Sequence, residues 1–190
     1  MHDPLRATPW TAARERGGKT ALYQNLVEEL EALLQGETDP VANAANTAAA
    51  IFHSLPDLNW VGCYFVRGQQ LVLGPFQGKP ACVRIPLGKG VCGTAAAERR
   101  SVLVADVHAF PGHIACDAAS RSELVVPVLM APVPMAPLSS GTGSRDARVL
   151  GVLDLDSPLP GRFDAVDQAG CEAIAALLAR HLPQGWPTAC

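Results

Sequence analysis

The chain has 190 residues, of which 48% are hydrophobic and 17% charged, and its net charge is -3. This length predicts one globular domain with a core large enough to need no disulfides. The negative charge and the absence of a basic stripe argue against a nucleic-acid partner. No apolar run approaches the roughly 20 residues of a membrane span, and the first residues contain no apolar signal region. We therefore expect a cytoplasmic protein. The chain contains six cysteines, and in a reducing cytoplasm cysteines are more often reactive or metal-bound than paired in structural disulfides.

The N-terminal part of the chain is predicted to be helical. Residues 1–19 show no periodicity and are expected to form an N-terminal arm. Leucines recur at helical spacing after Thr20, and Gly36 ends this first helix. A second helix opens at residues 39–40, where an aspartate cap is followed by proline. The apolar faces expected to point inward include Leu33 of the first helix and Val41 of the second.

Strands follow, because the apolar period changes from 3.6 to 2 after Pro56. Pro127 cannot donate to a ladder, so its strand should lie at a sheet edge or contain a bulge. A last helix is capped by Asp164 and is expected to bury Val166. The predicted strands cover residues 58–66, 71–74, 81–85, 101–105, 124–130 and 149–155, with a short helix at 92–98 and a long loop at 106–121.

This order of elements predicts an α+β fold. Few strands are separated by full crossover helices, so the six-stranded sheet should be mostly antiparallel, with helices packed on one face. The domain is expected to span residues 20–182, and residues 183–190 form an irregular tail. Residues 131–147 are rich in Pro, Ser and Gly and are expected to form an extended hairpin loop between the two strongest strands.

Three carboxylates are expected to meet near one end of the sheet. Alternation along the strand places Asp154 and Asp156 on the same face, roughly 6–7 Å apart. If this strand folds back on residues 124–130, Glu123 lies about opposite Leu155 and beside the acidic pair. Such a trio could hold an ammonium group, bind a metal or share a proton, and crowding raises the pKa of at least one member. A solvated strand end is the alternative interpretation.

Three cysteines lie in loop or turn regions, where reactive groups are usually found: Cys82, Cys92 and Cys116. A nucleophilic cysteine needs access and surroundings that favour the thiolate. Cys92 lies at a predicted helix N-terminus, whose dipole favours negative charge. Cys116 follows His108 and His113. The remaining cysteines are assigned to the core (Cys63 and Cys171) or have no evident role (Cys190).

A metal site is the rival use of the same residues. His108, His113 and Cys116 could supply three ligands, with Cys82 or Cys92 as the fourth. Their spacing matches no common zinc pattern, so we predict no metal and no cofactor.

Several blocks of the sequence closely resemble the free methionine-(R)-sulfoxide reductases. The blocks include Asn59-Trp60-Val-Gly62-Cys-Tyr64, Ala81-Cys82-Val-Arg84-Ile-Pro86, Gly90-Val-Cys92-Gly93-Thr94, Gly112-His113-Ile-Ala-Cys116-Asp117, Ser122-Glu123 and Gly151-Val-Leu-Asp154-Leu-Asp156-Ser157. The resemblance implies a single GAF-type domain, reduction of the R epimer of free methionine sulfoxide, and a homodimer.

The resemblance also implies roles for the three loop cysteines. Cys116 matches the family nucleophile, which attacks the sulfoxide sulfur and becomes a sulfenic acid. A second thiol then forms a disulfide with it, chiefly at the position of Cys82 with Cys92 as another participant. Thioredoxin would reduce this disulfide by exchange.

The substrate contacts follow from the same resemblance. Glu123, Asp154 and Asp156 match the acids that bind the substrate ammonium and polarise the sulfoxide, and Trp60 and Tyr64 would line the pocket for the S-methyl end. Two features depart from the family pattern, namely Pro80 before Cys82 and the length of the loop at 131–147. A GAF sensor module that binds a small ligand without turnover is the alternative from another functional class.

Overall fold

The computed structural model describes residues 18–112, 117–130, 147–183 and 186. Its helices are α2 (Gly18–Leu34), α3 (Pro40–Ser54), α4 (Gly90–Glu98) and α5 (Ala165–Arg180), and a 3-10 turn, η2, covers Val107–Ala109. Its strands are β1 (Trp60–Arg67), β2 (Gln70–Gly78), β3 (Arg84–Pro86), β4 (Val102–Val104), β5 (Ser122–Met130) and β6 (Arg148–Ser157). Most of the predicted arm, hairpin loop and tail lies outside the described residues. Helix α2 begins at Gly18, two residues before the predicted start.

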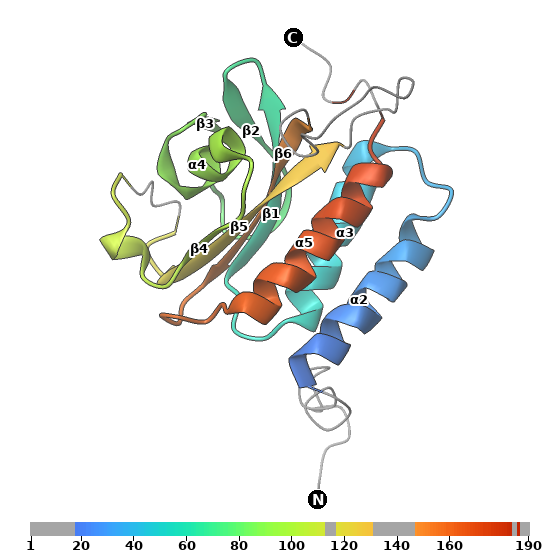
Figure 1. The fold of residues 1–190 in the computed structure, drawn as a ribbon, viewed down its shortest axis with the longest axis horizontal. Coiled ribbons are helices and arrows are strands. Elements are labelled where there is room, and N and C mark those ends of the chain that lie inside the picture. The colour runs from blue at the N-terminus through green and yellow to red at the C-terminus, as the bar shows by residue number, and fades with distance from the viewer. Residues whose placement is uncertain (1–17, 113–116, 131–146, 184–185, 187–190) are drawn as a thin grey trace, which may run out of the picture.

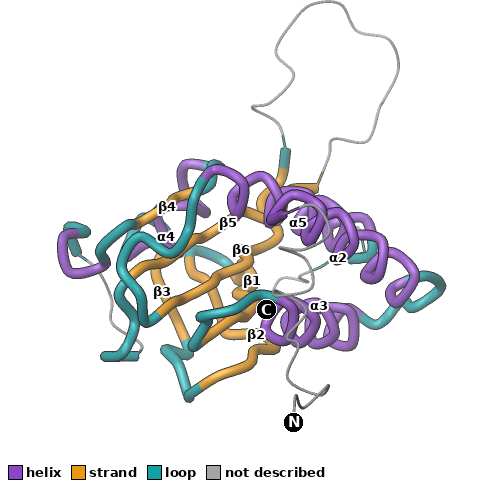
Figure 2. Tube along the Cα trace, turned by 90° about the horizontal axis from the view of Figure 1, so that it is seen from below, coloured by secondary structure: helices purple, strands orange, loops and turns teal. Residues whose placement is uncertain are grey.

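The strands form one six-stranded sheet in the order β3-β2-β1-β6-β5-β4, and every neighbouring pair is antiparallel. The predicted α+β class and the antiparallel six-stranded sheet are confirmed. Figure 1 shows α5, α3 and α2 on one side of the sheet and α4 on the other, so the expectation of helices on one face holds for the first three and is wrong for α4. The helix layer and the sheet are seen from another direction in Figure 2.

The two faces of the sheet carry separate cores because alternate strand residues point in opposite directions. Val61, Cys63 and Leu153 pack with α2, α3 and α5 in the larger core. Tyr64 and Val152 belong to the smaller core, which α4 covers with Val91 and Ala95. The larger core stabilises the domain, and the smaller one surrounds the candidate site.

The pairing of β5 with β6 sets the positions of the three carboxylates. Glu123 lies opposite Asp156, one residue from the predicted partner Leu155. Pro127 lies beyond the end of β4, which pairs only with residues 123–125, and β5 has a bulge between Val128 and Leu129. The expectation that proline marks an edge or a bulge is therefore confirmed.

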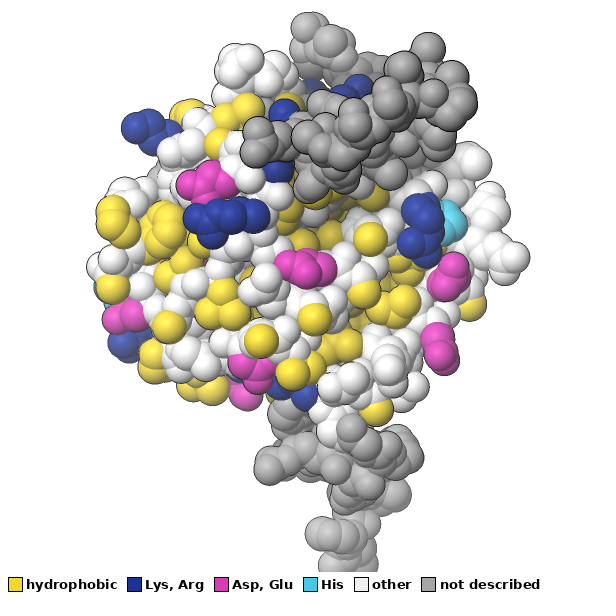
Figure 3. All heavy atoms as spheres, in the orientation of Figure 1, with side chains coloured by type: hydrophobic (Ala, Val, Ile, Leu, Met, Phe, Trp, Pro, Cys, Tyr) yellow, Lys and Arg dark blue, Asp and Glu magenta, His cyan; other side chains and the backbone are white. Residues whose placement is uncertain are grey.

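The helix ends agree with the sequence signals, whereas three side chains that were predicted to be buried are exposed. Asp39 and Asp164 cap α3 and α5 by accepting backbone N–H groups. Leu33, Val41 and Val166, all predicted to be buried, are instead 48%, 52% and 38% exposed. The helices bury a narrower stripe than the full run of apolar residues, and Figure 3 shows such side chains scattered over the helical face among isolated charged groups.

In the described part of the chain, no helix has the length and apolar character needed to cross a membrane.

Candidate active site

The predicted acidic cluster forms at the ends of β5 and β6. Asp154 and Asp156 are on the same face of β6, and Glu123 on β5 points to the same side because it lies directly opposite Asp156. Glu123 and Asp154 are each only 6% exposed, and Asp156 is half-buried. A solvated strand end would leave these carboxylates in water, so that alternative is wrong.

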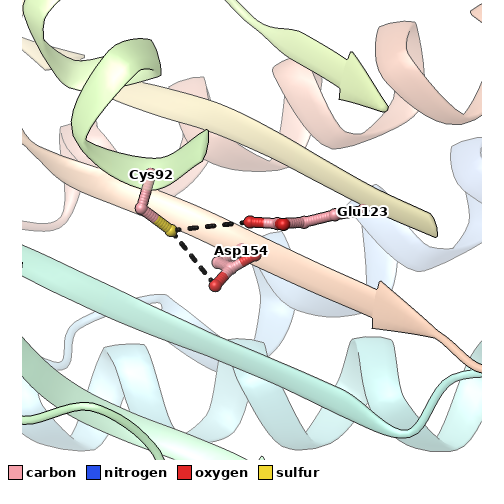
Figure 4. A group of neighbouring side chains, drawn as sticks. All are labelled: Cys92, Glu123 and Asp154. Carbon is pink, nitrogen blue, oxygen red and sulfur yellow. Dashed lines mark hydrogen bonds between the residues drawn. The ribbon is translucent and has the colours of Figure 1, made fainter. Parts of the chain in front are cut away.

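Cys92 reaches this cluster from α4, the helix that covers the face of the sheet on which the acids lie. Its Sγ lies 3.2 Å from Asp154 Oδ2 and 4.0 Å from Glu123 Oε1. Figure 4 shows the Cys92 sulfur pointing toward both carboxyl groups. The first turn of α4 packs closely against residues 86–88 because residue 93 is a glycine and has no side chain. A Cβ at Gly93 would overlap the carbonyl oxygen of Pro86. The sequence suggested Cys92 as a reactive thiol but not as a partner of Asp154.

The electrostatics of the cluster favour protonated groups. Burial, followed by the charge of Glu123, raises the pKa of Asp154 well above its usual value. Burial also raises the pKa of Glu123 and that of Asp156, each reinforced by a neighbouring carboxylate. The pKa of the Cys92 thiol is raised by burial and then by Asp154 and Glu123. This corrects the expectation of a thiolate at Cys92, because burial and the neighbouring carboxyl groups oppose loss of the thiol proton.

The cluster also contains an unmet acceptor. Considering the described residues, the Oδ1 atom of Asp154 is buried and has no hydrogen-bond partner. Buried carboxylate oxygens are normally paired, because desolvation of an unpaired one is costly. The site therefore suits a bound cation or a hydrogen-bond donor.

An aromatic wall lies next to the acids on the same face of the sheet. Trp60 stacks on Tyr64 with ring centroids 5.9 Å apart and on Phe76 at 5.4 Å. Gly62 lies between Trp60 and Tyr64 on β1, and a Cβ there would overlap both the indole ring and Phe76. Trp60 and Tyr64, predicted to line a substrate pocket, are buried in the smaller core beside the acids. The contact of Phe76 with Trp60 was missed because it depends on the pairing of β2 with β1.

The aromatic pair is also bonded to the segment that carries Cys82. Trp60 Nε1 donates to the carbonyl oxygen of Lys79 (3.1 Å), and the Tyr64 hydroxyl donates to that of Cys82 (3.0 Å). Cys82 is half-buried between β2 and β3. Cys116 and His113 lie outside the described residues, so their predicted roles stay predictions.

The two described cysteines assigned to packing are buried as expected. Cys63 and Cys171 are fully buried, and burial raises the pKa of each to about 12. Both assignments to the core are confirmed.

A metal would find a different ligand set from the one that the sequence suggested. Among the described residues, ligand atoms of Cys92, Glu123 and Asp154 all lie within 4.8 Å of one another. A metal would have to displace the proton of the Cys92 thiol, whereas an ammonium group can be bound with that thiol protonated. The cluster therefore has the ligand types for either kind of cation, and only the metal requires a change in the protonation of Cys92.

Comparison with known proteins identifies the family. Residues 22–182 match the GAF domain family. The chain is 45% identical over 164 residues to the free methionine-R-sulfoxide reductase of Escherichia coli, covering 86% of this chain and 90% of that protein. The free methionine-R-sulfoxide reductase of Neisseria meningitidis, solved in complex with its substrate, is 43% identical with a TM-score of 0.75, covering 87% of this chain and 90% of that one. The reduced form of fRMsr of Staphylococcus aureus is 44% identical with a TM-score of 0.74, covering 85% and 95% respectively.

The family match spans residues 22–182, a range that includes both helix layers and all six strands of the sheet. The chain therefore belongs to the GAF domain family and is a relative of the free methionine-R-sulfoxide reductases within it.

Proposed function

We propose that this protein reduces free methionine-(R)-sulfoxide to methionine. The observation that carries the proposal is the cluster of buried Glu123 and Asp154 with half-buried Asp156, in which Asp154 Oδ1 has no partner among the described residues. An amino-acid ammonium would donate to that oxygen and favour ionisation of the neighbouring acids. The names of the relatives support the same substrate.

The first chemical step is assigned to Cys116. Its thiolate attacks the sulfoxide sulfur while a carboxylic acid of the cluster protonates the oxygen. The attack joins the Cys116 sulfur to the substrate sulfur. The protonated oxygen then moves to the Cys116 sulfur as this S–S bond and the sulfoxide S–O bond both break, so methionine leaves and Cys116 becomes a sulfenic acid. The raised pKa values of the three carboxyl groups support this step, because a protonated acid must be present near neutral pH.

The second step consumes the sulfenic acid. The thiol of Cys82 attacks Cys116, the S–O bond of the sulfenic acid breaks, and its oxygen leaves as water with the thiol proton. Cys92 is the less favourable first attacker because burial and two acids keep it protonated. We assign the reduction of the disulfide to thioredoxin. A reducing cytoplasm is the compartment that suits this reaction. We also expect the protein to form a homodimer.

The aromatic wall supplies the apolar part of the pocket. Trp60 and Tyr64 lie beside the acids and would contact the S-methyl end of the substrate. A site that pairs the ammonium with buried acids excludes a methionine within a peptide, whose nitrogen is an uncharged amide.

The test is incubation with racemic free methionine sulfoxide and dithiothreitol, followed by chiral amino-acid analysis. We expect methionine to form while only the R epimer disappears. Cys116→Ser should abolish methionine formation. Cys82→Ser should spare a single turnover and impair recycling by thioredoxin. Wild-type activity in Cys116→Ser would disprove the assigned nucleophile, and binding without turnover by the wild type would favour the sensor alternative.

A further inference from the structure

Three side chains of types that commonly bind metal ions converge on one face of the sheet. Cys92 comes from α4, Glu123 from β5 and Asp154 from β6, so three separate elements place them. One ligand atom of each lies within 4.8 Å of the other two, and Figure 4 shows the groups pointing toward one another. All three residues are buried, so their positions are set by the packing around them.

The distances within this group fit a tetrahedral metal ion. Zinc binds thiolate sulfur at about 2.3 Å and carboxylate oxygen at about 2.0–2.2 Å, which separates a sulfur and an oxygen on one ion by about 3.5 Å. The Sγ of Cys92 lies 3.2 Å from Asp154 Oδ2 and 4.0 Å from Glu123 Oε1. Shifts of about 0.5 Å in the side chains would therefore bring all three atoms into one coordination shell.

The mixture of sulfur and oxygen ligands indicates which cation the group suits. Magnesium and calcium bind through oxygen atoms, whereas a thiolate ligand favours softer ions such as Zn²⁺. Three protein ligands also match the type of zinc site in which a solvent molecule takes the fourth position.

A second observation indicates a cation at the same place. Asp154 is 6% exposed, and its Oδ1 atom has no hydrogen-bond partner among the described residues. A buried carboxylate is normally paired with a positive charge or bound to a metal, because its desolvation is otherwise costly. An ion bound to Asp154 supplies that charge and needs no further hydrogen-bond donor.

We propose that Cys92, Glu123 and Asp154 bind Zn²⁺ and that the bound ion excludes the substrate. The ion takes the place of the thiol proton, so a sulfur–zinc bond forms as the S–H bond of Cys92 breaks and the proton passes to solvent. The substrate ammonium and the metal require the same carboxylate of Asp154, so Zn²⁺ inhibits in competition with free methionine-(R)-sulfoxide. This competition rests on the proposed function, whereas the metal binding does not.

The experiment titrates the reduced, full-length protein with Co²⁺, whose absorption reports both a thiolate ligand and a tetrahedral geometry. Cys82, Cys116 and Cys190 are first replaced by serine, so that none of these thiols supplies the signal. We expect one equivalent of Co²⁺ to bind with a thiolate charge-transfer band, and Zn²⁺ to displace it. In this background, Cys92→Ala should abolish the band, and Asp154→Asn should weaken binding at least about tenfold.

Two variants in the same background are the matched controls. Cys171→Ala removes a thiol that is fully buried in the larger core, on the other face of the sheet. Glu29→Gln removes an exposed carboxylate of α2. Both should bind Co²⁺ as the background protein does, and circular dichroism checks that every variant is folded.

Competition with the substrate tests the exclusion directly. The serine background lacks the proposed nucleophile, so free methionine-(R)-sulfoxide should displace Co²⁺ without being reduced, whereas its N-acetylated form should not displace the ion. A background protein that binds no Co²⁺, or a band that survives in Cys92→Ala, would overturn the metal site. A full band at a sulfoxide concentration that saturates the metal-free protein would overturn the exclusion. A wild type that forms no methionine would instead refute the proposed function and leave the metal titration unaffected.

Discussion

The decisive groups of the site are carboxyls whose ionisation is opposed by their surroundings. Glu123 and Asp154 are buried beside each other. The thiol of Cys92 donates a hydrogen bond to Asp154 but carries no positive charge that would offset the charge of an ionised carboxylate. The cost of ionising these acids without a cation reduces the stability of the unliganded protein at neutral pH. A site built in this way gives up stability in return for binding a charged substrate.

This cost predicts a pH dependence of stability. Unfolded carboxyls titrate near pH 4, whereas the folded pKa values of Glu123, Asp154 and Asp156 are raised. The folded state therefore binds more protons above about pH 4, and the free energy of unfolding contributed by these groups falls as pH rises toward the raised values. Asp154→Asn should make this decline shallower, as measured by urea unfolding at several pH values.

Glu29→Gln on the exposed face of α2 is the control for the titration series and should keep the wild-type slope. If Asp154→Asn also keeps that slope, ionisation of Asp154 is not opposed in the folded protein.

Single elements position the site through close packing. Strand β1 carries Trp60 and Tyr64 on the side of the acids, and Gly62 between them leaves room for the indole ring. Gly62→Ala should cost about 1–3 kcal/mol of stability by overpacking and raise KM for the sulfoxide, because Trp60 must move. Urea unfolding and steady-state kinetics check both effects.

Gly68→Ala is the matched control in the turn after β1. Its φ is +59° and a Cβ there meets no atom within 4 Å, so the cost should be confined to about 1–2 kcal/mol of backbone strain with an unchanged KM. An equal rise of KM in both variants would contradict a specific effect on Trp60.

On the helical face, Asp167 joins α2 to α5. It is fully buried, accepts from Tyr23 (2.9 Å) and forms ion pairs with Lys19 (2.6 Å) and Arg162 (3.1 Å). Asp167→Ala would leave Arg162 buried without this partner and should cost about 3–5 kcal/mol. Because this network is on the face away from the site, activity per folded molecule should remain at the wild-type level.

Urea unfolding and turnover corrected for the folded fraction measure the two effects of Asp167→Ala. A fall in turnover without a loss of stability would show that the network acts on the site.

The sequence predicted the grouping of the three carboxylates because period-2 alternation determines which strand residues share a face. It placed Asp154 with Asp156 and put Glu123 beside them to within one residue of the observed pairing. It could not place α4 on the face opposite the other helices, since that depends on contacts distant in the chain. The protonated state of Cys92 was missed for the same reason, because local helix position suggested a thiolate.

At the scale of the whole molecule, the chemistry is separated from the hairpin end of β5 and β6. Met130 pairs with Arg148, whereas Glu123 pairs with Asp156 at the other end. Seven residues of strand separate these ends, roughly 23 Å. Replacing residues 131–147 by a two-residue Asn-Gly turn should therefore leave kcat/KM unchanged. Steady-state kinetics on a variant with a native circular dichroism spectrum checks this, and a large loss of activity would contradict the placement.

The central claim is that buried acids select the substrate by its ammonium group. The most direct measurement compares free and N-acetylated methionine-(R)-sulfoxide as substrates of the wild-type protein with dithiothreitol as reductant. We predict methionine formation from the free amino acid and a kcat/KM at least about thirtyfold lower for the acetylated form, which corresponds to about 2 kcal/mol for a lost buried charge pair. Equal rates for the two substrates would contradict the account.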